Sequence, residues 1–232
     1  MEIALYLGAY VTYLLTRGLI HADTRAVGVV NGERVVSLQR DLGFLWEPGW
    51  QSWAVENVKA LVVTMNWVYI ITYWPVIFLA AFVLFIKSRS DYNFYRTVVF
   101  INLAGALLIF MTFPVASPFA IPSVVLLDSI QEFGPKFYGS EDMSTFYNIS
   151  AAMPSLHFSW TVILGVLFWR SFPGNLRLIG LLYPFLTFFA ITLTGNHFIL
   201  DAVAGGTLAG FSFSVVFLLR ATVWRHPTRL SA

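Results

Sequence analysis

The sequence predicts an all-α protein of the polytopic membrane class, a bundle of about six transmembrane helices. Hydrophobic residues make up 58% of the 232 residues and charged residues 11%, against roughly 45–50% and roughly 25% in an average globular chain. The apolar residues form long continuous runs, as membrane helices require, and do not alternate with polar ones. We therefore expect one integral-membrane domain over residues 1–232.

Six apolar runs are candidates for the spans. They cover residues 3–19, 58–86, 97–113, 155–169, 176–194 and 198–219. The first run lacks the basic segment and the cleavage site of a signal peptide, so we interpret it as an anchor that stays. Pro75 predicts a kink in the second run, because proline removes a helical hydrogen bond.

Basic residues in the short loops predict the orientation. With six spans, the loops after the second and fourth runs and the C-terminal tail fall on one side, and all three carry Lys or Arg. That side is expected to be the cytoplasm. The loop 114–152 and the turn at Gly195 then face outward from a plasma membrane. Within that loop, residues 114–133 form either a short amphipathic interfacial helix or an irregular packed loop.

Composition also excludes several function classes. A net charge of +2 gives no indication of a nucleic-acid partner, and the absence of cysteine excludes disulfide scaffolds, thiolate metal sites and cysteine nucleophiles. Two histidines and one aspartate, without other nearby ligands, support a metal site only weakly. We expect no cofactor.

Ionisable residues at the outer ends of two spans carry the functional signal. His157 follows Pro154 and Ser155, and His197 and Asp201 stand four apart, on one face of a helix. An aspartate in an apolar span is costly without a partner, and His197 is its expected partner.

Two helix starts are expected to meet at these residues. Pro154 suits the first position of the fourth span, and Asn196 suits the N-cap of the sixth. Both helices would then present free N–H groups and a positive dipole end to an anion such as phosphate.

This chemistry favours phosphoryl transfer through histidine. His197 is the expected nucleophile, Asp201 the group that orients its ring, and His157 the general acid for the leaving oxygen. Two alternatives stay open: a structural His–Asp pair that only ties helices together, and a Ser-His-Asp triad with Ser155 as nucleophile. The triad lacks the Gly-x-Ser-x-Gly elbow.

The residues Ala-Ala-Met-Pro-Ser-Leu-His at 151–157 and Thr-Gly-Asn-His-Phe-Ile-Leu-Asp at 194–201 resemble the second and third motifs of the type 2 phosphatidic acid phosphatase (PAP2) superfamily. The Leu before His157 and the absence of an Arg upstream of His197 resemble its inositolphosphotransferase branch, which includes inositol phosphorylceramide synthases. The resemblance implies a PAP2-like core over about 38–220, the same roles for the three residues, no metal requirement and phosphate-bearing lipid substrates.

One departure concerns the phosphate clamp of the superfamily's first motif. Where the branch often shows Pro-Pro-Arg, this chain has Ser117-Pro118-Phe119. Arg40, Lys59 or Lys136 are candidate replacements. Arg40 is preferred because it precedes a glycine turn and pairs by spacing with Glu47. Ser155 and Asn196 are the other expected substrate-binding residues. Tyr69 and Tyr73 either line the cleft or belong to an aromatic belt.

The predicted function is a membrane lipid phosphotransferase or phosphatase that acts at the outer leaflet through a phosphohistidine. Transfer to an alcohol such as inositol is slightly favoured. The alternatives are a phosphatase for lipid phosphates or polyprenyl diphosphates that uses water, and a non-catalytic lipid-binding scaffold. A transporter fits least, because its ionisable residues would lie near the middle of the membrane. The sequence does not indicate the oligomeric state.

Overall fold

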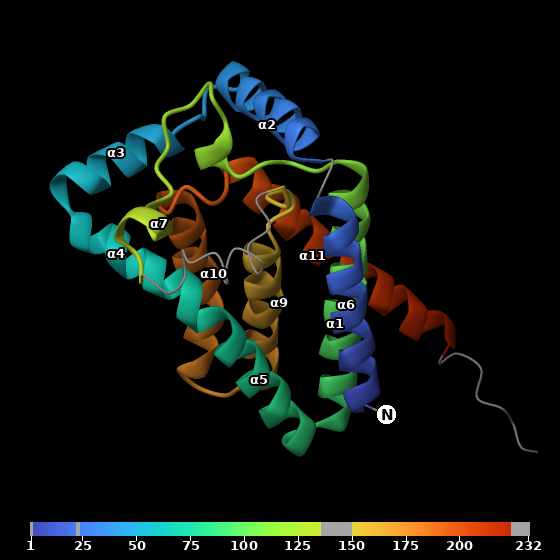
Figure 1. Ribbon diagram of the computed structural model, residues 1–232. Coiled ribbons are helices and arrows are strands. Elements are labelled where there is room, and N and C mark those ends of the chain that lie inside the picture. The colour runs from blue at the N-terminus through green and yellow to red at the C-terminus, as the bar shows by residue number, and fades with distance from the viewer. Residues whose placement is uncertain (1, 22–23, 136–149, 224–232) are drawn as a thin grey trace, which may run out of the picture.

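The computed structural model describes residues 2–21, 24–135 and 150–223, and this part of the chain is helical without a named strand (Figure 1). The longer helices are α1 (Glu2–His21), α2 (Thr24–Asp41), α3 (Glu47–Asn57), α4 (Lys59–Trp67), α5 (Tyr73–Lys87), α6 (Arg89–Thr112), α9 (Leu156–Ser171), α10 (Leu176–Leu193) and α11 (Ile199–Val223). The short elements are a π-helical turn, η1 (Val68–Thr72), a 3₁₀ turn, η2 (Pro118–Ala120), and α7 (Ser129–Phe133).

Helix α9 lies at the centre of the bundle and packs against α10, α11, α6 and α5 (Figure 1). The contact with α10 is close because two glycines face each other. A Cβ on Gly165 would lie 2.5 Å from the carbonyl oxygen of Gly180, and the converse distance is the same. Small residues that let helix backbones approach are typical of helix pairs in membranes.

Three helical stretches are long and apolar enough to cross a membrane: Lys59–Lys87, Arg89–Thr112 and Ile199–Arg220. Shorter apolar stretches lie in α1 and α10, at Ala4–Leu14 and Arg177–Leu193, and α9 has 16 residues. Each of the six predicted runs is thus a helix, but the prediction of six spans is not confirmed.

The kink expected at Pro75 takes the form of a π-helical turn just before it. Residues 68–72 are π-helical, and Pro75 lies in the first turn of α5. A proline ring clashes with the carbonyl four residues earlier, here that of Ile71, and a widened turn relieves this clash. The turn also sets the directions in which Tyr69 and Tyr73 point.

A buried polar network joins three helices inside the bundle. The side-chain amide of Asn102 on α6 donates to the hydroxyls of Ser159 on α9 (2.8 Å) and Ser212 on α11 (3.3 Å). The indole N–H of Trp160 donates to the side-chain oxygen of Asn102 at 3.0 Å. Every polar atom of the Asn102 side chain has a partner, so the network fixes α6, α9 and α11 relative to one another.

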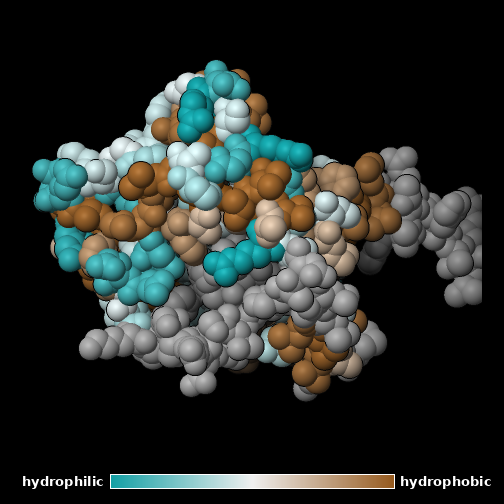
Figure 2. Space-filling model, turned by 45° about the horizontal axis from the view of Figure 1, so that its top comes forward, coloured by the Kyte–Doolittle hydropathy of each residue, from teal (hydrophilic) through white to brown (hydrophobic). Residues whose placement is uncertain are grey.

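Helices α2 and α3 lie across the end of the bundle where α11 begins (Figure 1). Figure 2 looks toward this end and shows polar and apolar side chains intermixed on the surface. None of the six predicted runs covers this segment, which carries charges of both signs. The start of α3 does carry a signal: an acidic residue followed by a proline, Glu47 and Pro48.

Residues 114–133 form an irregular packed loop, which is one of the two alternatives that the sequence left open. The segment contains only η2 and the five-residue α7. Its path is held from neighbouring elements: the Gln51 side chain bonds both the N–H and the C=O of Leu127, and Asn66 bonds Ser129.

Candidate functional site

His197 lies in the turn between α10 and α11, two residues before α11 begins. The turn requires Gly195, which has a φ of 75° and whose missing Cβ would lie 2.4 Å from the carbonyl oxygen of Leu127. The N–H of His197 donates to the carbonyl of Ile191 at 3.1 Å, which ties the turn back to α10. The backbone around His197 is therefore held from both sides.

The hydrogen bond of the His197 ring defines its reactive nitrogen. Nδ1 lies 2.9 Å from the carbonyl oxygen of Ala152. A carbonyl only accepts, so in the neutral ring the proton is on Nδ1 and the lone pair is on Nε2. The residue is buried, with 6% exposure, and lines an apolar cavity. This tautomer leaves Nε2 as the nitrogen that can attack phosphorus.

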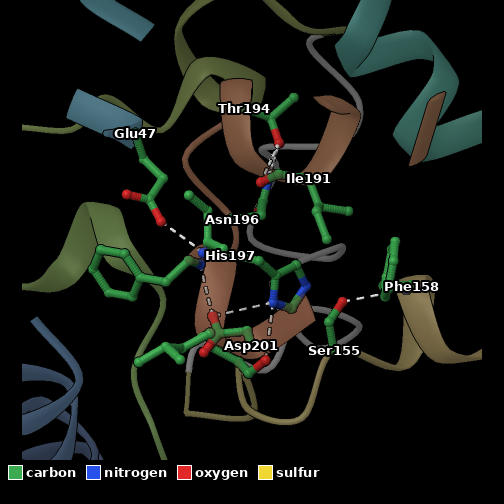
Figure 3. Close-up of polar contacts among 12 residues, drawn as sticks. Glu47, Ser155, Phe158, Ile191, Thr194, Asn196, His197 and Asp201 are labelled. Carbon is green, nitrogen blue, oxygen red and sulfur yellow. Dashed lines mark hydrogen bonds and ion pairs between the residues drawn. The ribbon is translucent and has the colours of Figure 1, made fainter. Parts of the chain in front are cut away.

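Asp201 lies beside the same ring, as the spacing predicted (Figure 3). Its Oδ2 is 3.5 Å from Nδ1 of His197, longer than the contact of that nitrogen with the Ala152 carbonyl. Oδ2 makes a shorter bond, of 2.8 Å, with the N–H of Phe198, while Oδ1 has no partner among the described residues. The Ala152 carbonyl and the Asp201 carboxylate therefore orient the His197 ring together.

The predicted anion site at the start of α11 is wrong, because protein groups already occupy its N–H groups. Asp201 accepts from the N–H of Phe198, Glu47 from that of Ile199 (2.6 Å) and Gln39 from that of Leu200 (3.0 Å). Asn196 is not the N-cap: its amide donates to the Thr194 hydroxyl. No signal in the sequence indicated Gln39, since the residue that it contacts on α11, Leu200, is 161 residues away.

Glu47 and Gln39 form a buried pair behind the candidate nucleophile. Gln39 Nε2 donates to both carboxylate oxygens of Glu47, at 2.8 and 3.1 Å, and both side chains are fully buried. Burial raises the pKa of Glu47 above its usual 4.5, although the hydrogen bonds from Gln39 and Ile199 act in the opposite direction. The pair stabilises the first turn of α11 and so the position of Asp201.

The start of α9 differs from the prediction by two residues. Ser155 is the N-cap, and its hydroxyl accepts from the N–H of Phe158 at 3.3 Å, whereas Pro154 precedes the cap. Ser155 is fully buried, and it is not among the residues that line the cavity. Within the described residues, no acceptor contacts the N–H groups of Leu156 and His157. Of the described part of the chain, no group therefore competes with an anion for these two donors.

His157 faces His197 across the end of the cavity, with 6.1 Å between the ring centroids. The His157 ring lies against Tyr69 and Tyr73, each 4.3 Å away between centroids. Both tyrosines are buried and line the cleft, so the aromatic-belt alternative is wrong for them.

The cavity beside the two histidines has a volume of about 830 Å³ and is mostly apolar. Asn196 lines it together with His157 and His197. Arg96 is its only lysine or arginine among the described residues, and Arg96 is paired with Glu2. The described residues contain no group of three or more His, Cys, Asp or Glu suited to a metal ion.

The expected basic clamp does not lie at the cavity in the described part of the chain. Arg40 is exposed at the end of α2, and Gln39 rather than Arg40 contacts Glu47, which corrects the expected pairing. Lys59 lies over the ring of Phe133 and does not line the cavity. Lys136 falls outside the described residues. Among the described residues, the ring of His157 and the start of α9 are the groups at this end of the cavity that could hold a phosphate beside His197.

The starts of α9 and α11 touch at a glycine. Ser155 N–H donates to the carbonyl of Asp201 at 3.0 Å, and a Cβ on Gly205 would lie 2.4 Å from the Ser155 carbonyl oxygen. His157 is two residues after Ser155, and His197 is four residues before Asp201. The contact between Ser155 and Asp201 therefore sets the distance between the two histidines.

We expect Gly205→Ala to separate the two helix starts and lower turnover at least about tenfold, with a stability loss of about 1–3 kcal/mol from overpacking. Gly210→Ala is the matched control on the same helix, since its Cβ would meet nothing within 4 Å. It should preserve turnover and keep or raise the melting temperature. Equal behaviour of the two variants would contradict the proposed role of this contact.

Glu47 predicts a pH dependence of stability. Because its pKa is raised on folding, it favours the folded state most below pH 4.5, and this contribution is lost as the pH rises through the raised pKa. The melting temperature of Glu47→Gln should lack this decline. Glu56→Gln, at an exposed site on the same helix, should reproduce the wild-type profile. Superimposable profiles for all three proteins would refute the prediction.

The long apolar helices and the two histidines at the end of an apolar cavity define the class of protein: a helical membrane protein with a candidate nucleophile and proton donor side by side. A family model described as the PAP2 superfamily matches residues 33–215, and the chain belongs to this superfamily. No curated protein and no solved structure matches it.

Membership confirms the resemblance stated from the two motifs and makes the chain a phosphatase or phosphotransferase-type enzyme. The non-catalytic scaffold is therefore set aside. No relative tests the inositolphosphotransferase branch, which stays a prediction.

Proposed function

We propose that this enzyme acts on a phosphate-bearing lipid through a phosphohistidine on His197, at the extracytoplasmic face of the plasma membrane. The observation that carries the proposal is the hydrogen bond between Nδ1 of His197 and the Ala152 carbonyl, since it leaves the lone pair on Nε2 of a ring whose centroid is 6.1 Å from that of His157. A single histidine without such a partner would lack a defined tautomer.

In the first step, Nε2 of His197 attacks phosphorus and the bond from phosphorus to the leaving oxygen breaks. His157 in its cationic form donates a proton to that oxygen, so the lipid alcohol departs neutral. The ring of His197 becomes positively charged, and the Asp201 carboxylate 3.5 Å from Nδ1 stabilises this charge.

In the second step, the hydroxyl of an acceptor attacks phosphorus and breaks its bond to Nε2. His157, now neutral, takes the proton from that hydroxyl, which restores both histidines. With a lipid monophosphate as substrate, water as acceptor yields inorganic phosphate, whereas an alcohol such as inositol yields the phosphate monoester of that alcohol. With a phosphodiester substrate, transfer to the alcohol yields a new phosphodiester. Transfer to an alcohol is slightly favoured on the motif resemblance, and hydrolysis is the alternative.

The phosphate is proposed to bind between the two rings, at the start of α9. The N–H groups of Leu156 and His157 lie there, and Asn196 lines the same end of the cavity. Ser155 supports this site as the N-cap of α9. Arg40 is the weakest of the proposed substrate-binding residues, because its exposed position places it away from the cavity.

The test uses purified full-length protein in detergent with lipid monophosphates, diphosphates and phosphodiesters, with and without inositol. Released inorganic phosphate indicates hydrolysis, and a new phosphate ester of the alcohol that forms only when the alcohol is present indicates transfer. With radiolabelled phosphate, we expect an acid-labile label on the chain during turnover. Turnover without any such label would argue against the phosphohistidine, and the absence of turnover on every class of lipid phosphate would argue against the substrate class.

A further inference from the structure

The apolar cavity at the two histidines has a closed side and an open side. Its lining residues on α6 and α9 are buried or partly buried, and Tyr95, Phe110, Ile163 and Leu167 are among the buried ones. Several large lining residues on α1 and α5 are exposed instead: Leu7, Tyr10, Trp74, Phe78 and Phe82 are each at least half exposed. The cavity therefore opens between α1 and α5, the side from which a molecule in the bilayer enters.

A polar cluster closes the end of the cavity that is remote from the histidines. Glu2 on α1 pairs with Arg96 on α6, and the Tyr92 hydroxyl donates to Glu2 at 2.8 Å. Tyr6 completes the cluster through its contact with the Tyr92 hydroxyl. Glu2, Tyr6, Tyr92 and Arg96 all line the cavity. The Glu2 and Arg96 side chains are partly exposed, and a hydrocarbon chain that reached them would displace water from the charged pair, which is costly.

The distance between the two ends exceeds one leaflet of a bilayer. The cavity-lining stretch of α6 from Arg96 to Phe110 is about 21 Å long at about 1.5 Å per residue. Half of a hydrocarbon core of about 30 Å is only about 15 Å. The wall also includes α1, which lies outside the matched residues 33–215.

We propose that the cavity binds the hydrocarbon tail of a long-chain lipid phosphate, and that the Glu2–Arg96–Tyr92 cluster sets the maximum length of that tail. The proposal rests on the proposed function for the position of the phosphate. Its substrate class is a lipid with a tail longer than one leaflet is deep. Chains that end before the cluster gain binding with each added carbon, and longer chains lose it.

The test places a bulky side chain inside the cavity. Ala81 on α5 lines it between Tyr73, which contacts the His157 ring, and Phe85, which contacts Tyr92. With alkyl monophosphates of increasing length, we expect kcat/KM of the wild type to rise and then fall. Ala81→Phe should lower kcat/KM at least tenfold for the longest good substrates and leave short ones unchanged. Ala104→Phe, an exposed position on α6 outside the cavity, should keep the wild-type length profile.

A binding measurement separates this inference from the proposed function. An alkyl monophosphate with a diazirine at its terminal carbon is cross-linked to the full-length His197→Ala variant, and the labelled residues are mapped. Labels near Arg96 that move toward His157 as the chain shortens support the inference, even if no lipid phosphate is turned over. Labels elsewhere, or an equal loss at all lengths in Ala81→Phe, overturn it even when the enzyme is active.

Discussion

His197→Ala is expected to lower turnover by on the order of 10⁴–10⁶-fold, the range found when a catalytic nucleophile is removed. The physical reason is that Nε2 of His197 is the only proposed bond-forming atom of the first step. The side chain lies at the cavity wall in the turn before α11, and one hydrogen bond, to the Ala152 carbonyl, is lost. The fold should therefore persist, with a stability loss of about 1 kcal/mol.

The measurement compares phosphate release, label on the chain and melting temperature in wild type and variant. Turnover and label should vanish together while the melting temperature changes little. A variant that keeps more than a tenth of the wild-type turnover would show that another group attacks phosphorus. Ser155 is then the alternative to examine, although its hydroxyl accepts from the Phe158 N–H.

His157→Gln is expected to slow the reaction by about 10²–10⁴-fold, the usual contribution of a general acid. Glutamine keeps the approximate size and a polar end between Tyr69 and Tyr73 but supplies no proton. The loss should depend on the leaving group. An alkoxide leaving group needs the proton, whereas an aryl oxide of low pKa departs without it.

The diagnostic experiment pairs an alkyl phosphate with an aryl phosphate of similar size. His157→Gln should lose much more activity on the alkyl phosphate than on the aryl phosphate. His197→Ala should lose activity on both substrates alike, which makes it the comparison variant. Equal losses of His157→Gln on the two substrates would assign His157 to phosphate binding rather than to proton transfer.

The sequence predicted the helices well because their signal is local. Continuous apolar runs such as 97–113 and 176–194 correspond to α6 (Arg89–Thr112) and α10 (Leu176–Leu193). The run of 155–169 likewise corresponds to α9. The number of spans was less predictable, because length and hydropathy alone do not distinguish a short membrane helix from a buried one.

Helices outside the apolar runs were not predicted from the sequence. Helices α2 and α3 carry residues of mixed sign and no clear period, so the sequence showed no helix there. Their importance is visible only in the tertiary structure, where Glu47 and Gln39 accept hydrogen bonds from the first turn of α11. The expectation of free N–H groups at that turn failed for this reason: a local motif does not reveal which distant residue satisfies a helix end.

By itself, the sequence determined the membrane class, the superfamily and the His197–Asp201 pair, since these depend on composition and on residues four apart on one helix. Only the tertiary structure decided which nitrogen of His197 is left for phosphorus, which helix start keeps its donors and where the cavity ends. Those features depend on Ala152, Glu47 and Glu2, residues distant in sequence from His197 or Arg96 that packing brings into contact.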